Sequence, residues 1–65
     1  MQILVNGESV ATDARDLAEL CASLGFTHAK VATALNGHFV ASAKRGLTPL
    51  APKDEVEIVA PRQGG

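Results

Sequence analysis

The sequence contains few of the residues that build disulfide frameworks or stacking surfaces. Among its 65 residues there are one cysteine, two phenylalanines and no tyrosine or tryptophan. The single Cys21 cannot form an internal disulfide, which favours a reducing compartment. So few aromatic rings argue against the stacking platforms of nucleic-acid-binding proteins. A net charge of −1 argues against a clustered basic surface for phosphates.

Long hydrophobic runs are also missing. The apolar start Met1–Val5 has no basic residues before it and is too short for a signal peptide or a membrane span. We therefore expect a cytoplasmic protein without nucleic-acid or membrane partners.

The length and composition are those of one small globular domain. The chain is 46% hydrophobic, and a domain of this size buries roughly 60% of its unfolded surface. It has little room for an enclosed ligand pocket, which would hollow out the core. We expect a domain over residues 1–60 and a flexible tail over residues 61–65.

Alternation of apolar and polar residues predicts the strands, which are residues 1–6, 8–11, 31–36, 38–41 and 55–59. Asn6-Gly7 and Asn36-Gly37 predict two-residue type I′ hairpin turns, because both turn positions need positive φ. Residues 42–53 predict an irregular loop, in which Lys44 and Arg45 are expected to be solvated.

One amphipathic helix is predicted over residues 14–24. Thr12 or Asp13 can serve as its N-cap, and Gly25 lies where a left-handed C-cap is expected. The apolar stripe of this helix consists of Leu17, Leu20, Cys21 and Leu24. A single helix on a mixed sheet of four to five strands is a two-layer α+β fold.

The sequence ends in Gly64-Gly65, which leaves no side chain close to the terminal carboxylate. Chance gives this ending in about 0.5% of chains, taking glycine at roughly 7% per position. Pro61 stops the last strand, because proline cannot donate to a strand ladder. Such an ending suits a chain whose C-terminus is itself the reacting group.

The order of elements, together with this ending, resembles the ThiS family of ubiquitin-like, β-grasp sulfur carriers. The resemblance covers essentially the whole chain and rests on four stretches, which are residues 2–7, 31–37, 53–59 and 61–65.

The resemblance implies that the Gly65 carboxylate is adenylated by a ThiF-type adenylyltransferase, which uses ATP and magnesium. Sulfur from a persulfide donor, such as a cysteine desulfurase, then replaces AMP and leaves a thiocarboxylate. This sulfur goes to thiazole synthase, ThiG, for the thiazole ring of thiamin. The carrier would be no enzyme, would hold no cofactor stably and would be a monomer when free.

The tail residues next to Gly65 are Gly64, Gln63 and Arg62. Many relatives have an apolar residue where Arg62 stands, so we expect Arg62 to tune partner contact and not chemistry. If the encoded protein continues beyond Gly65, cleavage would have to precede activation.

A docking surface is predicted on the sheet. If Ile3 and Ile58 face the helix, Leu4 and Val59 face the opposite way, and Phe39 could join them. This patch would bind the activating enzyme. The alternative is that these are scattered surface apolar residues, which are ordinary in soluble proteins.

Other candidate sites have ordinary structural interpretations. Cys21 is expected in the core because it shares the apolar stripe of the helix. His28 and His38 lack the spacing of a zinc or catalytic site and are expected in surface loops. Asp54, Glu55 and Glu57 could form an acidic docking site, or the solvated face of a strand. No metal ligands and no catalytic residues are predicted.

Two other functions remain open. A MoaD-like carrier would apply the same chemistry to molybdopterin synthesis, although such proteins tend to be longer. A non-reactive β-grasp binding domain would have no need of the Gly-Gly ending, so deleting Gly65 would leave its function nearly unchanged.

Overall fold

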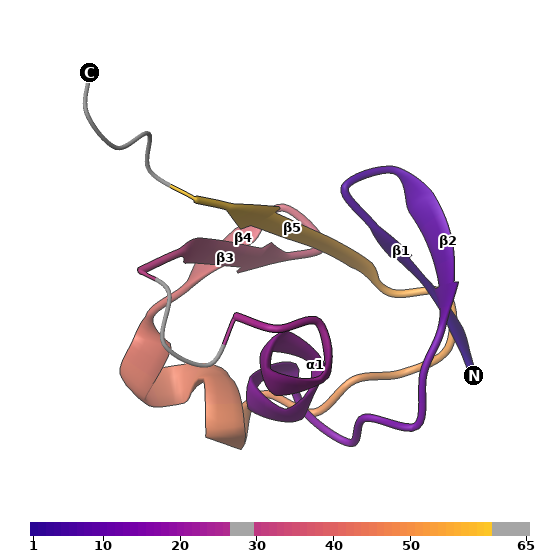
Figure 1. Ribbon diagram of the computed structural model, residues 1–65, viewed down its shortest axis with the longest axis horizontal. Helices are drawn as coiled ribbons and strands as arrows, with labels where there is room; N and C mark the ends of the chain where they lie inside the picture. Colours follow the sequence, from indigo (N-terminus) through magenta and orange to yellow (C-terminus); the bar gives the residue numbers. More distant parts are fainter. Residues whose placement is uncertain (27–29, 61–65) are drawn as a thin grey trace.

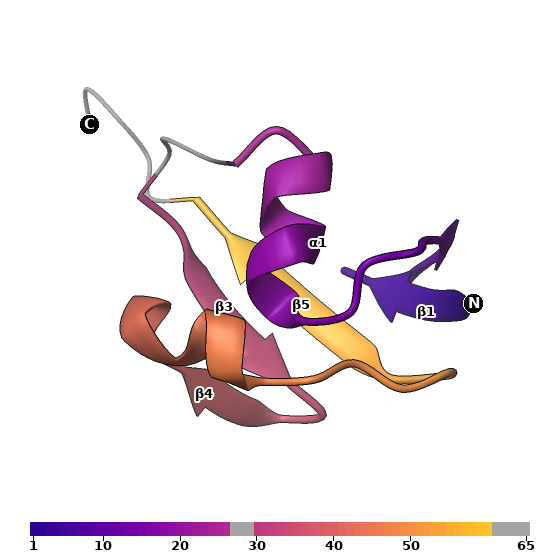
Figure 2. The same cartoon turned by 90° about the horizontal axis from the view of Figure 1, so that it is seen from below.

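The computed structural model describes residues 1–26 and 30–60. In this part of the chain the elements are β1 (Gln2–Val5), β2 (Glu8–Ala11), α1 (Leu17–Ser23), β3 (Ala32–Leu35), β4 (His38–Val40), the 3₁₀ helix η1 (Ser42–Leu47) and β5 (Glu55–Val59). The strands form one sheet, and α1 and η1 lie on the same side of it (Figures 1 and 2). The predicted α+β architecture is confirmed.

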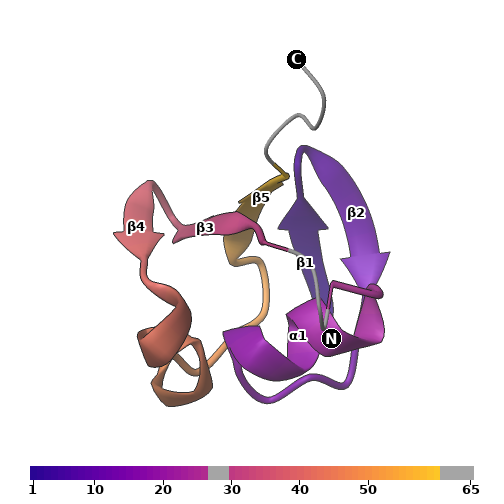
Figure 3. The ribbon, with the colours of Figure 1, turned by 60° about the vertical axis from the view of Figure 1, so that its left-hand side comes forward.

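The last strand lies in the middle of the sheet. The described strands have the order β2-β1-β5-β3-β4. β5 runs parallel to β1 and antiparallel to β3, and each of these neighbours forms an antiparallel hairpin with an edge strand. The sheet is therefore two hairpins joined by β5, which lies between them (Figure 3).

Both hairpins turn at an asparagine-glycine pair, as predicted. Asn6 and Gly7 have φ of 51° and 84°, and Asn36 and Gly37 have φ of 49° and 85°. These values are those of the left-handed region that a type I′ turn requires at both positions. Asparagine tolerates this region better than most residues with a Cβ atom, which explains why it is the first residue of each turn.

Helix α1 begins later than predicted. It starts at Leu17, and its N-cap is Asp16, whose Oδ1 accepts a hydrogen bond of 2.8 Å from the Glu19 amide. The prediction of Thr12 or Asp13 as the cap is wrong. The Thr12 hydroxyl instead accepts a bond of 3.0 Å from the Ala14 amide, a local turn that competes with helix formation.

The end of α1 is as predicted. Gly25 has φ of 89°, the Phe26 amide donates to the Cys21 carbonyl at 2.9 Å, and the Gly25 amide donates to the Ala22 carbonyl at 3.1 Å. This pair of bonds is a Schellman motif. Leu24 is 38% exposed, so the predicted apolar stripe is buried only up to Cys21.

The core lies between α1 and the sheet. Its buried apolar residues are Ile3, Ala14, Leu17, Leu20, Cys21, Val56 and Ile58. Burying one large apolar side chain stabilises a fold by about 1.5–3 kcal/mol. β5 supplies two of these residues, so the central strand is fixed by packing as well as by its ladders.

The predicted irregular loop contains a short helix. η1 covers Ser42–Leu47, and beyond it the Leu17 amide donates to the Thr48 carbonyl at 3.0 Å and the Leu50 amide donates to the Arg15 carbonyl at 3.1 Å. The segment is therefore tied to the start of α1. Across residues 1–26 and 30–60, no helix has the length and apolar character needed to cross a bilayer.

Candidate functional site

The predicted reacting end lies outside the described residues. Gly65, Gly64, Gln63 and Arg62 all belong to residues 61–65, which the structure does not describe. The division into a domain over 1–60 and a flexible tail stays a prediction for the same reason. The structure does describe the strand from which this segment continues.

β5 is held along both edges. On one side Leu4 pairs with Glu55 and Val5 with Val56. On the other side the ladder with β3 continues from Leu35, which is opposite Val56, to Ala32, which is opposite Val59. The last residue of β5 is thus still paired.

The two turn asparagines extend these ladders with their side chains. The Asn6 side chain exchanges two hydrogen bonds with the backbone of Ile58. The Asn36 side chain accepts a bond of 2.9 Å from the Glu55 amide and donates one of 3.1 Å to the Asp54 carboxylate. Each hairpin turn therefore holds one end of β5.

The two faces of β5 differ in what covers them. Val56 and Ile58 are 1% and 5% exposed and contribute to the core under α1. Glu55, Glu57 and Val59 alternate with them and are exposed. In Figure 1, α1 and η1 lie below the sheet, whereas no other described element lies above it. We call this upper side the open face.

The three residues predicted for docking lie on the open face but not together. Phe39 is 74% exposed and Val59 is 61% exposed. Phe39 is opposite Ala34 on β3, and Val59 is opposite Ala32. Phe39 and Val59 thus flank two small residues. We call these four residues the Phe39–Val59 patch.

Leu4 lies apart from this patch. It pairs with Glu55, four residues before Val59, which corresponds to roughly 13 Å along a strand. The side chain of Leu4 is half-buried. Glu57 is opposite Ala34 and borders the patch itself, and Glu55 lies further toward Leu4 on the same face. A partner that covered Leu4 as well as the patch would therefore have to accommodate both carboxylates.

The end of β5 borders a surface hollow. Val59 and Ala32 line it together with Lys30 and Val31, and its volume is about 310 Å³. The surface of the Phe39–Val59 patch therefore continues from Ala32, the first residue of β3, to Val31 and Lys30 just before it. This places an apolar surface directly beside the point where the chain continues into residues 61–65.

Cys21 is a core residue, as predicted. It is 5% exposed, and burial raises the pKa of its thiol, an effect that the nearby Arg45 guanidinium partly opposes. A raised pKa keeps the thiol protonated at neutral pH, and the thiol is a much weaker nucleophile than the thiolate. The environment of Cys21 is that of a structural residue.

Arg45 has a different environment from the one predicted. Its Nε donates to the Thr33 hydroxyl at 3.0 Å, and its terminal nitrogen donates to the Val31 carbonyl at 2.6 Å. Thr33 is 1% exposed, and its hydroxyl donates in turn to the Val40 carbonyl at 2.7 Å. Arg45 is therefore not a solvated loop residue but a link from η1 to β3. Lys44 is exposed, as expected.

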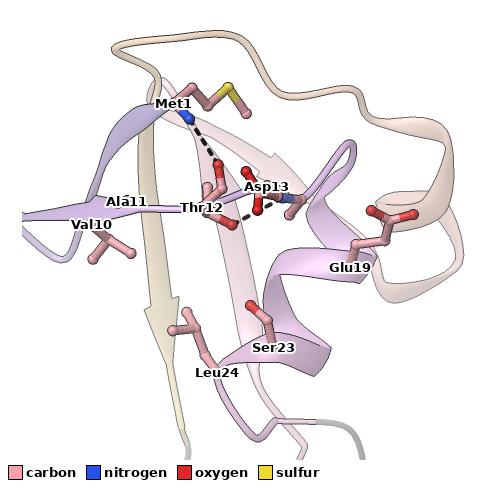
Figure 4. A pocket seen from close by; sticks show the side chains of 9 residues that line it. Met1, Val10, Ala11, Thr12, Asp13, Glu19, Ser23 and Leu24 are labelled. Carbon is pink, nitrogen blue, oxygen red and sulfur yellow. Dashed lines mark hydrogen bonds between the residues drawn. The ribbon is translucent and has the colours of Figure 1, made fainter.

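A second hollow, of about 620 Å³, lies between β2 and α1. Figure 4 shows Val10 and Leu24 at one end and Asp13 and Glu19 at the other. Hydrogen bonds from the Arg15 amide and guanidinium lower the pKa of Glu19. This hollow was not predicted from the sequence, because it depends on how the segment 12–16 places α1 relative to β2.

The remaining candidates show no chemical site. His38 is exposed in β4, which agrees with the strand predicted over residues 38–41 and not with the surface loop expected for this histidine, and His28 lies outside the described residues. Over residues 1–26 and 30–60, no three His, Cys, Asp or Glu side chains gather in a way that could hold a metal ion.

The comparisons with known proteins agree with one another. The model of the ThiS family matches residues 2–65. The crystal structure of a thiamine biosynthesis protein (ThiS) from Geobacter metallireducens is similar to this chain, with a TM-score of 0.83 and 28% sequence identity, and the match covers 100% of both chains. No protein with a curated description is significantly similar in sequence.

Proposed function

This chain belongs to the ThiS family, and on that premise we propose that it is a sulfur carrier for thiamin biosynthesis. The observation that carries this proposal is the extent of the family match, which runs from residue 2 through Gly64 and Gly65. The relative from Geobacter metallireducens, a thiamine biosynthesis protein, supports the same pathway.

In the proposed reaction, the Gly65 carboxylate attacks the α-phosphorus of ATP and releases pyrophosphate. The product is an acyl-adenylate, a far better electrophile than a carboxylate. A persulfide sulfur then attacks the acyl carbon and expels AMP, and a thiol cleaves the resulting sulfur–sulfur bond. This leaves a thiocarboxylate on Gly65 and a disulfide on the donor side.

The role of the carrier in this chemistry is presentation. A ThiF-type adenylyltransferase would supply the catalytic groups and bind ATP with its magnesium ion. The carrier would present Gly65, with Gly64 as a slim neighbour and with Gln63 and Arg62 in contact with the partner. β5 supports this role, because it is held up to Val59 on the β3 edge and up to Ile58 on the opposite edge.

We further propose that the Phe39–Val59 patch binds the activating enzyme. The patch lies on the face that α1 leaves open and beside the end of β5, so an enzyme seated on it would lie next to the chain end. Exposed apolar residues that become buried in a complex are the usual source of such affinity. Leu4 would contribute at most to the margin of the interface.

Thiazole synthase, ThiG, would receive the sulfur, and a cysteine desulfurase would provide it. The free carrier is proposed to be a monomer in the cytoplasm. Which large partner co-purifies, thiazole synthase or the catalytic subunit of molybdopterin synthase, separates the thiamin pathway from the molybdopterin alternative.

Intact-mass spectrometry tests the proposal directly. The chain is incubated with a ThiF-type enzyme, ATP, a cysteine desulfurase and cysteine. We expect a mass gain equal to the exchange of one oxygen for sulfur, located on Gly65 by fragmentation. Matched controls omit ATP or use a chain that lacks Gly65, and neither should gain sulfur. The proposal would be refuted if the full-length chain stayed unmodified while the same enzyme preparation activated another carrier.

A further inference from the structure

β1 and β5 do not end together. β1 stops at Val5, where the chain turns back at Asn6 and Gly7, whereas β5 continues to Val59. The last backbone amide that bonds to β5 on this edge is that of Asn6, directly after β1, which donates to the Val56 carbonyl at 2.9 Å. Beyond this bond, the amide and carbonyl of Ile58 face the same edge without a strand residue beside them.

The Asn6 side chain takes the place of the missing strand residue. Its Oδ1 accepts a bond of 2.9 Å from the Ile58 amide, and its Nδ2 donates one of 3.0 Å to the Ile58 carbonyl. A primary amide carries the same donor and acceptor as a peptide unit. The ladder therefore continues past the turn by one side chain, and both atoms are partly buried.

Asn36 provides a comparison within the same molecule. It has nearly the same φ as Asn6, 49° against 51°, and is also followed by glycine. However, its side chain binds Glu55 and Asp54, at the beginning of β5. Only Asn6 acts at the end from which the chain continues toward Gly65.

We propose that Asn6 is a positioning residue for the reacting C-terminus. Its amide fixes the position and direction of the last residues of β5. This inference rests on the proposed function, since it assumes that the residues after Val59 carry the reaction. Asn6 does not touch the reacting atoms and acts only through Ile58.

Loss of the side-chain amide would leave the amide and carbonyl of Ile58 without partners on this edge, and the end of β5 would be held by its ladder with β3 alone. The end of β5 would then sample more conformations in the free protein, and binding to the activating enzyme would have to order it, at an entropic cost. Because this cost arises on binding and is absent once the complex has formed, it should raise KM and leave kcat nearly unchanged.

The test uses Asn6→Gly, with Asn36→Gly as its matched control. Glycine favours the φ of both turns, so each variant keeps its turn and loses only the side-chain amide. For Asn6→Gly we expect a KM for the carrier in the adenylation reaction that is about tenfold higher, which corresponds to about 1.4 kcal/mol, with kcat within about twofold. For Asn36→Gly we expect a nearly unchanged KM.

Amide hydrogen exchange gives a readout that does not depend on the enzyme. Exchange at Ile58 should be about tenfold faster in Asn6→Gly, again corresponding to about 1.4 kcal/mol, and unchanged in Asn36→Gly. Asn6→Asp keeps an acceptor for the Ile58 amide but loses the donor, so its KM should lie between those of the wild type and Asn6→Gly.

Three results would overturn the positioning role: equal KM changes in the two glycine variants, a fall in kcat with KM unchanged, or unaltered exchange at Ile58. The failure of the proposed function looks different, because the wild-type chain would then not be adenylated at all. In that case, faster exchange at Ile58 in Asn6→Gly would still show that the Asn6 side chain stabilises the end of β5. Unaltered exchange would show that it does not.

Discussion

The two faces of β5 have different roles, because one contributes to the core and the other is exposed. Val56 and Ile58 are almost fully buried, whereas Val59, one residue further, is 61% exposed. All three are β-branched and apolar, so their chemistry cannot explain the difference. It follows from the period of two in a strand, which gives alternate residues to the core and to the open face. Apolar residues on the covered face stabilise the fold, and those on the open face are available to a partner.

The largest effect should come from a change on the covered face. Leu20→Ala removes a fully buried side chain of α1 and should lower the free energy of unfolding by about 2–5 kcal/mol. The total for a domain of this length is only about 3–10 kcal/mol. Urea denaturation measures the loss. Val59→Ala on the open face is the control and should cost less than about 0.5 kcal/mol. Equal losses would contradict the division between the faces.

A smaller effect is expected from the polar link on the covered side. Arg45→Ala removes the charged donor to the Val31 carbonyl and to the Thr33 hydroxyl, at a cost of about 1–3 kcal/mol. The neighbouring Lys44→Ala is a close control, because Lys44 is exposed, and should be nearly neutral. If the two variants unfold at the same denaturant concentration, the link does not stabilise the domain.

The open face should respond in binding and not in stability. Phe39→Ala should weaken the complex with the ThiF-type enzyme about tenfold, or about 1.4 kcal/mol, while the free energy of unfolding changes by less than about 0.5 kcal/mol. Isothermal titration calorimetry measures the affinity. Leu4→Ala should have a smaller effect, because Glu55 and Glu57 lie between Leu4 and the patch. An affinity that depends on Leu4 as strongly as on Phe39 would place the interface elsewhere.

The smallest effect concerns a pair outside both faces. Glu19 has a lowered pKa because Arg15 binds its carboxylate. A folded-state pKa below the unfolded value gives a stabilisation that is present above the unfolded pKa, near 4.5, and is lost as the pH falls through the folded value. Glu19→Gln should therefore reduce stability slightly at pH 7 and progressively less as the pH falls below about 4.5, as measured by thermal unfolding. A larger difference at pH 3 would have the wrong sign.

Much of the fold could be predicted because its signals are local. Residues 55–58 alternate between polar and apolar side chains, and each Asn-Gly pair specifies its own turn. The start of α1 could not be predicted in the same way, since Thr12, Asp13 and Asp16 are all able to cap a helix. The Thr12 hydroxyl is engaged in a local turn with the Ala14 amide, and the Asp16 carboxylate caps the helix instead.

The contacts that depend on tertiary structure were not predictable. Arg45 reaches Val31 and Thr33, more than ten residues away, and a basic residue in a loop gives no sign of such a link. The bonds between Asn6 and Ile58 span 52 residues. The turn itself accounts for asparagine at position 6, so the sequence gives no reason to look for a second role. The order of the strands along the sheet is likewise a property of the whole chain.

The central position of β5 has a consequence for synthesis. The two hairpins emerge from the ribosome first, but they contact each other in the sheet only through a strand made afterwards. Pairing between distant segments is slow and comes late in folding, so the sheet cannot close before β5 has been made. A nascent product cut short before residue 59 would lack the middle of its sheet and would be exposed to proteolysis. Folding would thus be coupled to the completion of β5, so a chain truncated inside this strand would be degraded before it met a partner.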